Sequence, residues 1–96
     1  MAVEYIYDTI RATSGENITI CAIITDDDNE PITDNCYLSL LDYDYNEMCK
    51  TYGAYDGEQW SFTIPDYITE GHTGRYWYKI GKNDVDLCFR TAIYLV

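Results

Sequence analysis

The chain has a single histidine, His72, and a hydrolytic triad needs a histidine that a carboxylate orients beside a nucleophile. His72 lies between Gly71 and Thr73, in a segment whose glycines mark it as a loop. We therefore expect no catalytic residue in this chain.

Carboxylates are the second candidate for chemistry, because the chain has 17 aspartates and glutamates. In glycoside hydrolases two carboxylates converge in a cleft and have separated pKa values. Here the acids concentrate in turn-forming segments such as residues 26–30 and 42–47, which we expect to face water. This pattern favours solvated carboxylates over a catalytic pair.

The acidic run DDDNE at residues 26–30 also raises the question of a calcium site. An EF-hand loop that begins at Asp26 needs glycine at its sixth position and glutamate at its twelfth, and this chain has Pro31 and Tyr37 there. A looser site that joins two loops of a sandwich stays open, since calcium needs only several converging oxygens. We expect no metal and no cofactor.

The four cysteines are Cys21, Cys36, Cys49 and Cys88, separated by 14, 12 and 38 residues. No Cys-x-x-Cys pair is present to begin a tetrahedral zinc site. The N-terminal sequence MAVEYIYD carries an acid where a signal peptide has basic residues, which favours a reducing compartment. We therefore expect free thiols.

Aromatic residues are the side chains whose positions suggest binding. The chain has 11 tyrosines, and Tyr43, Tyr45, Tyr52 and Tyr55 occur in or beside expected turns. Trp77 falls on the face of its strand opposite the expected core. Tyrosine and tryptophan supply large amphipathic area at protein interfaces, so these five residues are the candidate partner contacts. The alternatives are half-buried sandwich tyrosines and a Trp77 that packs under a loop.

The formal charge of −11, from 6 basic and 17 acidic residues, limits the classes of partner. Nucleic acid and anionic lipid would be repelled, and no apolar run approaches the length of about 20 residues that spans a bilayer. We expect neither direct nucleic-acid binding nor membrane association. The charge fits solubility, a basic partner surface, or imitation of DNA in a DNA-binding cleft.

These candidate residues are carried by segments with the two-residue period of β-strands. The clearest segments are residues 17–25, 36–42, 59–64 and 75–80. Further strands are expected at residues 5–12, 48–52 and 85–96, with turns at 26–31 and 81–84, and residues 68–73 have room for one helical turn. The sequence predicts an all-β fold, an antiparallel β-sandwich of about seven strands in one domain over residues 1–96.

An ordered series of motifs runs through these strands: SGENITI at residues 14–20, DDNEPI at 27–32, LSL at 38–40 and GRYWY at 74–78. Over residues 12–96 the chain resembles the immunoglobulin-like domains of tailed-phage virion proteins, found in capsid decoration proteins and at the N-termini of upper baseplate proteins. The resemblance implies an immunoglobulin-like sandwich that acts by protein–protein contact. It also implies a virion location after assembly in the host cytoplasm.

The pattern departs from antibody domains in its cysteines. Cys21 is predicted to lie on the face opposite Ile18 and Ile20, and Tyr78 stands where a second bridging cysteine would be expected. The inter-sheet disulfide is therefore not expected. Tyr76 is either a residue of the tyrosine-corner type or an ordinary core tyrosine.

The leading hypothesis is a non-enzymatic virion structural protein, a capsid decoration protein or a tail or baseplate adaptor. It predicts other virion proteins as partners, in an oligomer or a symmetric assembly. The alternative is a small acidic inhibitor of host defence that mimics DNA, which needs carboxylates arrayed along one face. Carbohydrate recognition through exposed aromatic residues ranks third, and whether residues 1–8 pair within the domain or with a neighbour stays open.

Overall fold

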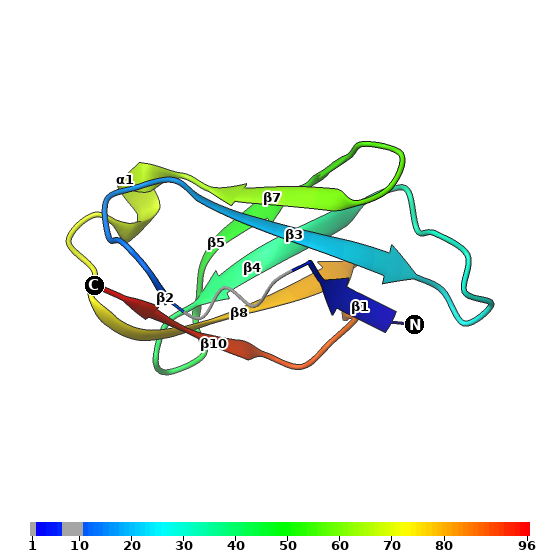
Figure 1. Cartoon of the computed structure of the whole chain (residues 1–96). Helices are drawn as coiled ribbons and strands as arrows, with labels where there is room; N and C mark the ends of the chain where they lie inside the picture. The colour runs from blue at the N-terminus through cyan, green and yellow to red at the C-terminus, as the bar shows by residue number, and fades with distance from the viewer. Residues whose placement is uncertain (1, 7–10) are drawn as a thin grey trace.

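The computed structural model describes residues 2–6 and 11–96, which form two β-sheets packed face to face (Figure 1). The four-stranded sheet has the order β1 (Ala2–Tyr5), β3 (Ile18–Thr25), β7 (Trp60–Ile64), β6 (Ala54–Tyr55). The six-stranded sheet has the order β2 (Arg11–Ala12), β10 (Thr91–Leu95), β8 (Gly74–Lys82), β4 (Cys36–Leu41), β5 (Glu47–Tyr52), with β9 (Val85–Asp86) also paired to β8.

Three of the ten strands in the described part of the chain have only two residues, and seven have four or more. The predicted all-β sandwich of about seven strands is therefore confirmed. Its pairing is antiparallel except between β2 and β10, which run parallel. No helix of the described residues is long and apolar enough to cross a membrane.

The hydrophobic core lies between the sheets and follows the predicted alternation. In the four-stranded sheet Ile20 pairs with Phe62, and both side chains are fully buried. Leu38 pairs with Ile80 in the opposite sheet, where both are also buried. Cys21 points away from the core, as predicted. The remaining buried apolar side chains of this core are Ile18, Ala22, Ile24, Ile32, Cys36, Leu40, Trp60, Ile64, Tyr78, Ile93 and Leu95.

The predicted single strand over residues 5–12 is wrong, because the N-terminal segment contributes to both sheets. β1 pairs antiparallel with β3, whereas β2 pairs with β10 in the other sheet. Each sheet thereby gains an edge strand, which a single straight strand could not provide. Residues 2–5 pair within their own chain. Part of this prediction, residues 7–10, lies outside the described residues.

The predicted strand over residues 85–96 is also interrupted, and Phe89 does not join the core. Leu87 and Cys88 both pack against the core, although they are adjacent in sequence. Two consecutive inward side chains break the two-residue period, and the next residue, Phe89, is left 96% exposed. The predicted hairpin turn is confirmed, because Asn83 and Asp84 between β8 and β9 both have positive φ, as type I′ turns require.

The single helical turn, α1 (Asp66–Thr69), is anchored to the loop that precedes β3. Thr69 is fully buried, and its hydroxyl accepts a hydrogen bond from the Gly15 N–H at 3.0 Å. The Ser14 hydroxyl donates to the Thr69 carbonyl at 2.6 Å, and the Asn17 side chain accepts from the Asp66 N–H at 2.9 Å. The polar SGEN segment at residues 14–17 therefore anchors α1 at this end of the sandwich.

Candidate interaction surface

The outer face of the six-stranded sheet carries a group of stacked aromatic and arginine side chains centred on Trp77. The rings of Trp77 and Tyr45 lie 5.7 Å apart between centroids. The Arg75 guanidinium carbon lies 4.7 Å from the Trp77 ring, and that of Arg90 lies 4.0 Å from the Tyr45 ring and 5.9 Å from the Trp77 ring. We call Tyr45, Arg75, Trp77 and Arg90 the aromatic–arginine cluster.

Three separate segments bring this cluster together. Arg75 and Trp77 are two residues apart on β8, so they share its outer face. Tyr45 comes from the loop between β4 and β5, and Arg90 from the loop that leads into β10. The cluster therefore depends on the pairing of β8 with β4 on one side and with β10 on the other.

Tyr45 has a left-handed backbone conformation, with φ at 66°. Its loop is closed by Asp42, whose Oδ1 accepts hydrogen bonds from the N–H groups of Asp44 and Asn46 at 2.9 Å. The loop after β3 is built in the same way, from Asp26, but places Asn29 at the equivalent position with φ at 62°. Asparagine suits this conformation and tyrosine does not, so the second loop contains a strained residue at the cluster.

The indole N–H of Trp77 is buried and has no hydrogen-bond acceptor among the residues that the structure describes. The other tryptophan differs, because the Trp60 indole donates to the Ile32 carbonyl at 2.7 Å. A buried donor without an acceptor costs about 1–3 kcal/mol. The cluster therefore contains a donor that the described part of the domain does not use.

The lysines and the arginines differ in whether they form ion pairs. All three lysines pair with aspartates, whereas Arg11, Arg75 and Arg90 form no ion pair within residues 2–6 and 11–96. The three lysine pairs are Lys50–Asp84 at 3.3 Å, Lys79–Asp86 at 3.0 Å and Lys82–Asp34 at 3.0 Å. The register places Arg11 beside Tyr94, on the same outer face as Arg75. This face consequently carries cations with unused donors on an acidic molecule.

A second aromatic group lies at the other end of the same face. Tyr37 is buried there because it lies over Gly81, where an added Cβ would come within 2.6 Å of the tyrosine hydroxyl. Tyr52 meets the Tyr37 ring edge-on at 5.8 Å and is 66% exposed, and Lys50 covers the Tyr37 ring at 4.3 Å. Aromatic side chains thus lie at both ends of the outer face of this sheet.

The five predicted contact residues are distributed unequally over the molecule. Tyr45 and Trp77 touch, Tyr43 lies in the same loop with 69% of its surface exposed, and Tyr52 lies farther along the sheet. Tyr55 belongs to the four-stranded sheet, where it stacks on Trp60 and packs against the core, so it does not join the others. Their contact with a partner stays a prediction.

Sequence reasoning missed Arg75, Phe89 and Arg90. Arg75 could have been found, because it is two residues from Trp77 and strand alternation places both on one face. Phe89 and Arg90 carried no such signal, since their orientation follows from the inward turn of Leu87 and Cys88. A short-range pattern cannot report that interruption.

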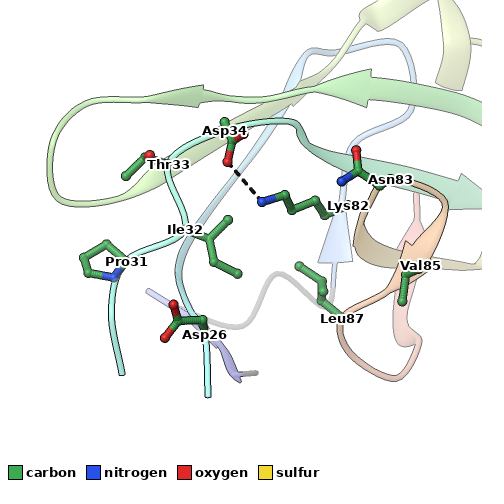
Figure 2. A pocket seen from close by; sticks show the side chains of 9 residues that line it. All are labelled: Asp26, Pro31, Ile32, Thr33, Asp34, Lys82, Asn83, Val85 and Leu87. Atoms are coloured by element: carbon green, nitrogen blue, oxygen red, sulfur yellow. Dashed lines mark hydrogen bonds and ion pairs between the residues drawn. The ribbon is translucent and has the colours of Figure 1, made fainter. Parts of the chain in front are cut away.

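A hollow of about 450 Å³ opens at one end of the sandwich, between the loop after β3 and the β8–β9 hairpin (Figure 2). Ile32 and Leu87 line it with apolar surface, and the Lys82–Asp34 ion pair spans one side. Asp26, which also lines the hollow, already accepts backbone hydrogen bonds through its carboxylate. The lining side chains include no histidine or cysteine, and the lysine is paired with one of the two aspartates, so the hollow can admit a side chain of a partner.

The remaining candidates for chemistry are engaged in structural contacts. The His72 Nδ1 lies 3.3 Å from the Tyr76 hydroxyl, which therefore meets a side chain and not the upstream backbone of a tyrosine corner. All four cysteines are free, and burial raises the pKa of the Cys36 and Cys49 thiols, which makes them weaker nucleophiles. Within the described residues, no three histidine, cysteine, aspartate or glutamate side chains are grouped to hold a metal.

Comparison with solved structures identifies the class of fold. The Lin-41 filamin domain superposes with a TM-score of 0.67 at 11% identity, covering 98% of this chain and 91% of that chain. The Ig1 domain of mouse SynCAM 2 gives a TM-score of 0.43 at 10% identity, covering 97% of this chain and 93% of that chain. No family model matches the sequence, and no curated protein matches it either. The filamin-domain match and the two-sheet topology show an immunoglobulin-like β-sandwich.

Proposed function

We propose that this protein is a non-enzymatic binding domain that acts through protein–protein contacts made by the outer face of its six-stranded sheet. The observation that carries the proposal is the aromatic–arginine cluster, in which the tilted rings of Trp77 and Tyr45 meet and an arginine guanidinium lies over each of them. Tryptophan, tyrosine and arginine are the residue types that dominate binding energy at protein interfaces.

The two outer faces of the sandwich differ in their aromatic and apolar content, as this proposal requires. The outer face of the four-stranded sheet carries small polar side chains such as Thr19, Ser61 and Thr63, and its exposed large apolar residues are the aliphatic Ile23 at 38% and, just after β1, Ile6 at 43%. The face of the six-stranded sheet carries tyrosines and a tryptophan, with Phe89 fully exposed at its margin. Phe89 lies next to Trp77 and so adds to a contiguous apolar area, which is the feature that marks a surface covered by a partner.

The virion setting is the more specific form of the proposal, and the sequence motifs over residues 12–96 support it. In this form the domain decorates a capsid or joins tail or baseplate proteins, within a symmetric assembly of other virion proteins. It is assembled in the host cytoplasm and resides in the virion. Immunogold labelling tests this: antibodies against the domain label virions purified from the culture that expresses it, and label confined to the soluble fraction contradicts the setting.

DNA mimicry receives less support from the distribution of charge. Asp26, Asp42 and Asp56 each lead a different loop and use their carboxylates to close it. Five of the six basic residues lie on or over the outer face of the six-stranded sheet: Arg11, Lys50, Arg75, Lys79 and Arg90. A DNA mimic needs a continuous row of carboxylates, and basic residues on the broadest face interrupt one.

The proposed function is tested by comparing variants of the two outer faces. Tagged wild-type protein, the Tyr45→Asn/Phe89→Ser variant and an Ile23→Ser control are incubated with an extract of the native host, and retained proteins are quantified by mass spectrometry. Proteins that the wild type retains are expected to be lost from the double variant and kept by the control. Equal retention by all three, or no specific retention, contradicts the proposal.

A further inference from the structure

We infer that the aromatic–arginine cluster recognises an acidic protein segment in extended conformation, whose carboxylates bind Arg75 and Arg90 while its backbone or side chain accepts the Trp77 indole N–H. This inference rests on the proposed function and assigns the chemistry of the partner. It follows from three features of the cluster: unpaired arginines, an unused buried donor and an adjoining hollow.

The unpaired arginines are the first feature. The chain has 17 acids for 6 bases, and the three lysines each pair with an aspartate of their own molecule. Arg75 and Arg90 instead lie over aromatic rings and form no ion pair within the described residues. A guanidinium has five N–H donors in a fork that matches a carboxylate, and stacking on a ring leaves those edges free. Two such forks lie near the ring of Trp77, at 4.7 Å and 5.9 Å from its centroid.

The second feature is the Trp77 indole N–H, which is buried between these groups without an acceptor in the described part of the chain. An arriving carbonyl or carboxylate oxygen would satisfy it and recover the cost of its isolation. Indole and guanidinium groups are both pure donors. A partner that fits this cluster must therefore be rich in acceptors.

The third feature is a hollow of about 320 Å³ beside the cluster, lined by Trp77, Lys79, Asp86, Cys88, Phe89 and Arg90. Its charged pair, Lys79 and Asp86, is already neutralised internally at 3.0 Å. The other walls are aromatic or apolar except for the Arg90 guanidinium. The hollow therefore suits a side chain that lies next to a carboxylate in the same segment.

An extended peptide fits this arrangement better than a nucleic acid. Carboxylates two residues apart in a strand lie on one side, about 7 Å apart, which suits two guanidiniums that both lie near one indole. The net charge of −11 repels a polyphosphate along its whole length, whereas a short segment with two or three carboxylates adds little charge. At physiological salt the repulsion is screened beyond about 8 Å, so local pairing decides the contact.

The experiment is a nuclear magnetic resonance titration of ¹⁵N-labelled protein with a capped heptapeptide of alternating serine and glutamate. The two indole N–H signals provide a probe and an internal control, because Trp77 lies in the cluster and Trp60 is bonded to Ile32 in the core. The Trp77 signal is expected to shift and that of Trp60 to stay. A peptide in which glutamine replaces glutamate is expected to bind at least tenfold more weakly.

Variants show whether the cluster is responsible. Arg75→Gln and Arg90→Gln are each expected to weaken the glutamate peptide at least fivefold, and Tyr45→Asn to weaken it while the fold is retained. Lys82→Gln removes one positive charge from the far side of the sheet, where it pairs with Asp34, and serves as the matched control with unchanged binding. Equal losses in Lys82→Gln and the arginine variants would show a general charge effect and overturn the inference.

The outcomes separate this inference from the proposed function. If the Tyr45→Asn/Phe89→Ser variant loses its native partners but the glutamate peptide leaves Trp77 unshifted, the surface binds protein and the acidic chemistry is wrong. The same conclusion follows if the glutamine peptide binds equally, or if single-stranded DNA shifts Trp77 at a lower concentration than the peptide does. If partner retention does not depend on this face, the proposed function fails.

Discussion

Tyr45 and Asn29 occupy the same position in two loops that have the same hydrogen-bonding pattern. Comparing the two loops therefore shows what a tyrosine in place of an asparagine costs in backbone conformation. Both have φ near the left-handed minimum, and in each loop an aspartate carboxylate accepts two backbone N–H groups. Asparagine adopts this conformation readily, whereas a tyrosine costs about 1–2 kcal/mol there. The second loop therefore keeps a costly residue where its ring meets Trp77 and Arg90.

Replacing Tyr45 by asparagine should leave the free energy of unfolding within about 1 kcal/mol of wild type. Relief of the left-handed conformation offsets the loss of aromatic contact, which is about 0.5–1.5 kcal/mol. The reverse change, Asn29→Tyr, adds the conformational cost without a ring partner and should destabilise by about 1 kcal/mol. Urea denaturation of both variants checks this, and a loss above about 2 kcal/mol in Tyr45→Asn contradicts it.

Thr69 is the fully buried polar residue that joins α1 to the SGEN loop. Thr69→Val keeps its shape but removes the acceptor for the Gly15 N–H, so it should destabilise by about 1–3 kcal/mol. Thr69→Ser retains the hydroxyl and should cost less, about 1 kcal/mol for the lost methyl group. Thermal unfolding of the pair separates the two causes, and equal losses would show that packing alone matters.

At the scale of elements, three aspartates explain why so acidic a chain forms tight loops. Asp26, Asp42 and Asp56 each precede a turn and accept backbone N–H groups two to four residues later. These local bonds compete well with water because the acceptor is charged. Many of the acids are thus part of the loop structure and not a binding surface.

Asp56 should make stability depend on acid pH. Backbone hydrogen bonds from Gln59 and then Glu58 hold the pKa of its carboxyl below the ordinary value of 3.8. A lowered pKa in the folded state gives stabilisation that is present above pH 3.8 and lost as the pH falls through the folded value. In Asp56→Asn the amide oxygen accepts the same bonds but does not titrate. The stability advantage of wild type over Asp56→Asn should therefore shrink from pH 5 to pH 2.5 in urea titrations, and a constant difference contradicts this.

At the scale of the whole molecule, 17 acids against 6 bases impose self-repulsion on the folded state. The repulsion acts between loops at separate places on the sandwich, so it is long-range and sensitive to salt. The proposed binding face carries five of the six basic residues, which offset part of this repulsion there. Charge distribution therefore favours this face for association with an acidic segment.

Salt should raise the melting temperature. Increasing sodium chloride from 0.01 M to 0.1 M shortens the screening length from about 30 Å to about 10 Å. If the stronger screening raises the free energy of unfolding by about 1 kcal/mol, the melting temperature rises by about 4–8 °C. Calcium chloride at equal ionic strength should give no further increase, because no acidic group in the described residues is arranged to hold a metal. A larger increase with calcium would reveal a cation site.

The sequence alone determined most of the longer strands and the alternation of their buried faces, because alternation is a local property of the backbone. In β3 and β7, every second residue is buried and the residues between them are not. The buried residues run from Ile18 to Ile24 in β3 and from Trp60 to Ile64 in β7. The turn at Asn83–Asp84 and the outward position of Trp77 follow from the same local rules. Prediction succeeded wherever a side chain's orientation depended on its immediate neighbours.

Only the tertiary structure decided which residues share the candidate site. Tyr45, Trp77 and Arg90 are far apart in sequence and meet because β8 pairs with β4 and β10. The same pairing exposes Phe89 and divides the N-terminal segment between the two sheets. These features depend on contacts between strands that are distant in sequence. Such contacts stabilise the fold only when both sheets have formed and pack against the same core. A local sequence pattern therefore cannot predict which distant residues this packing brings together.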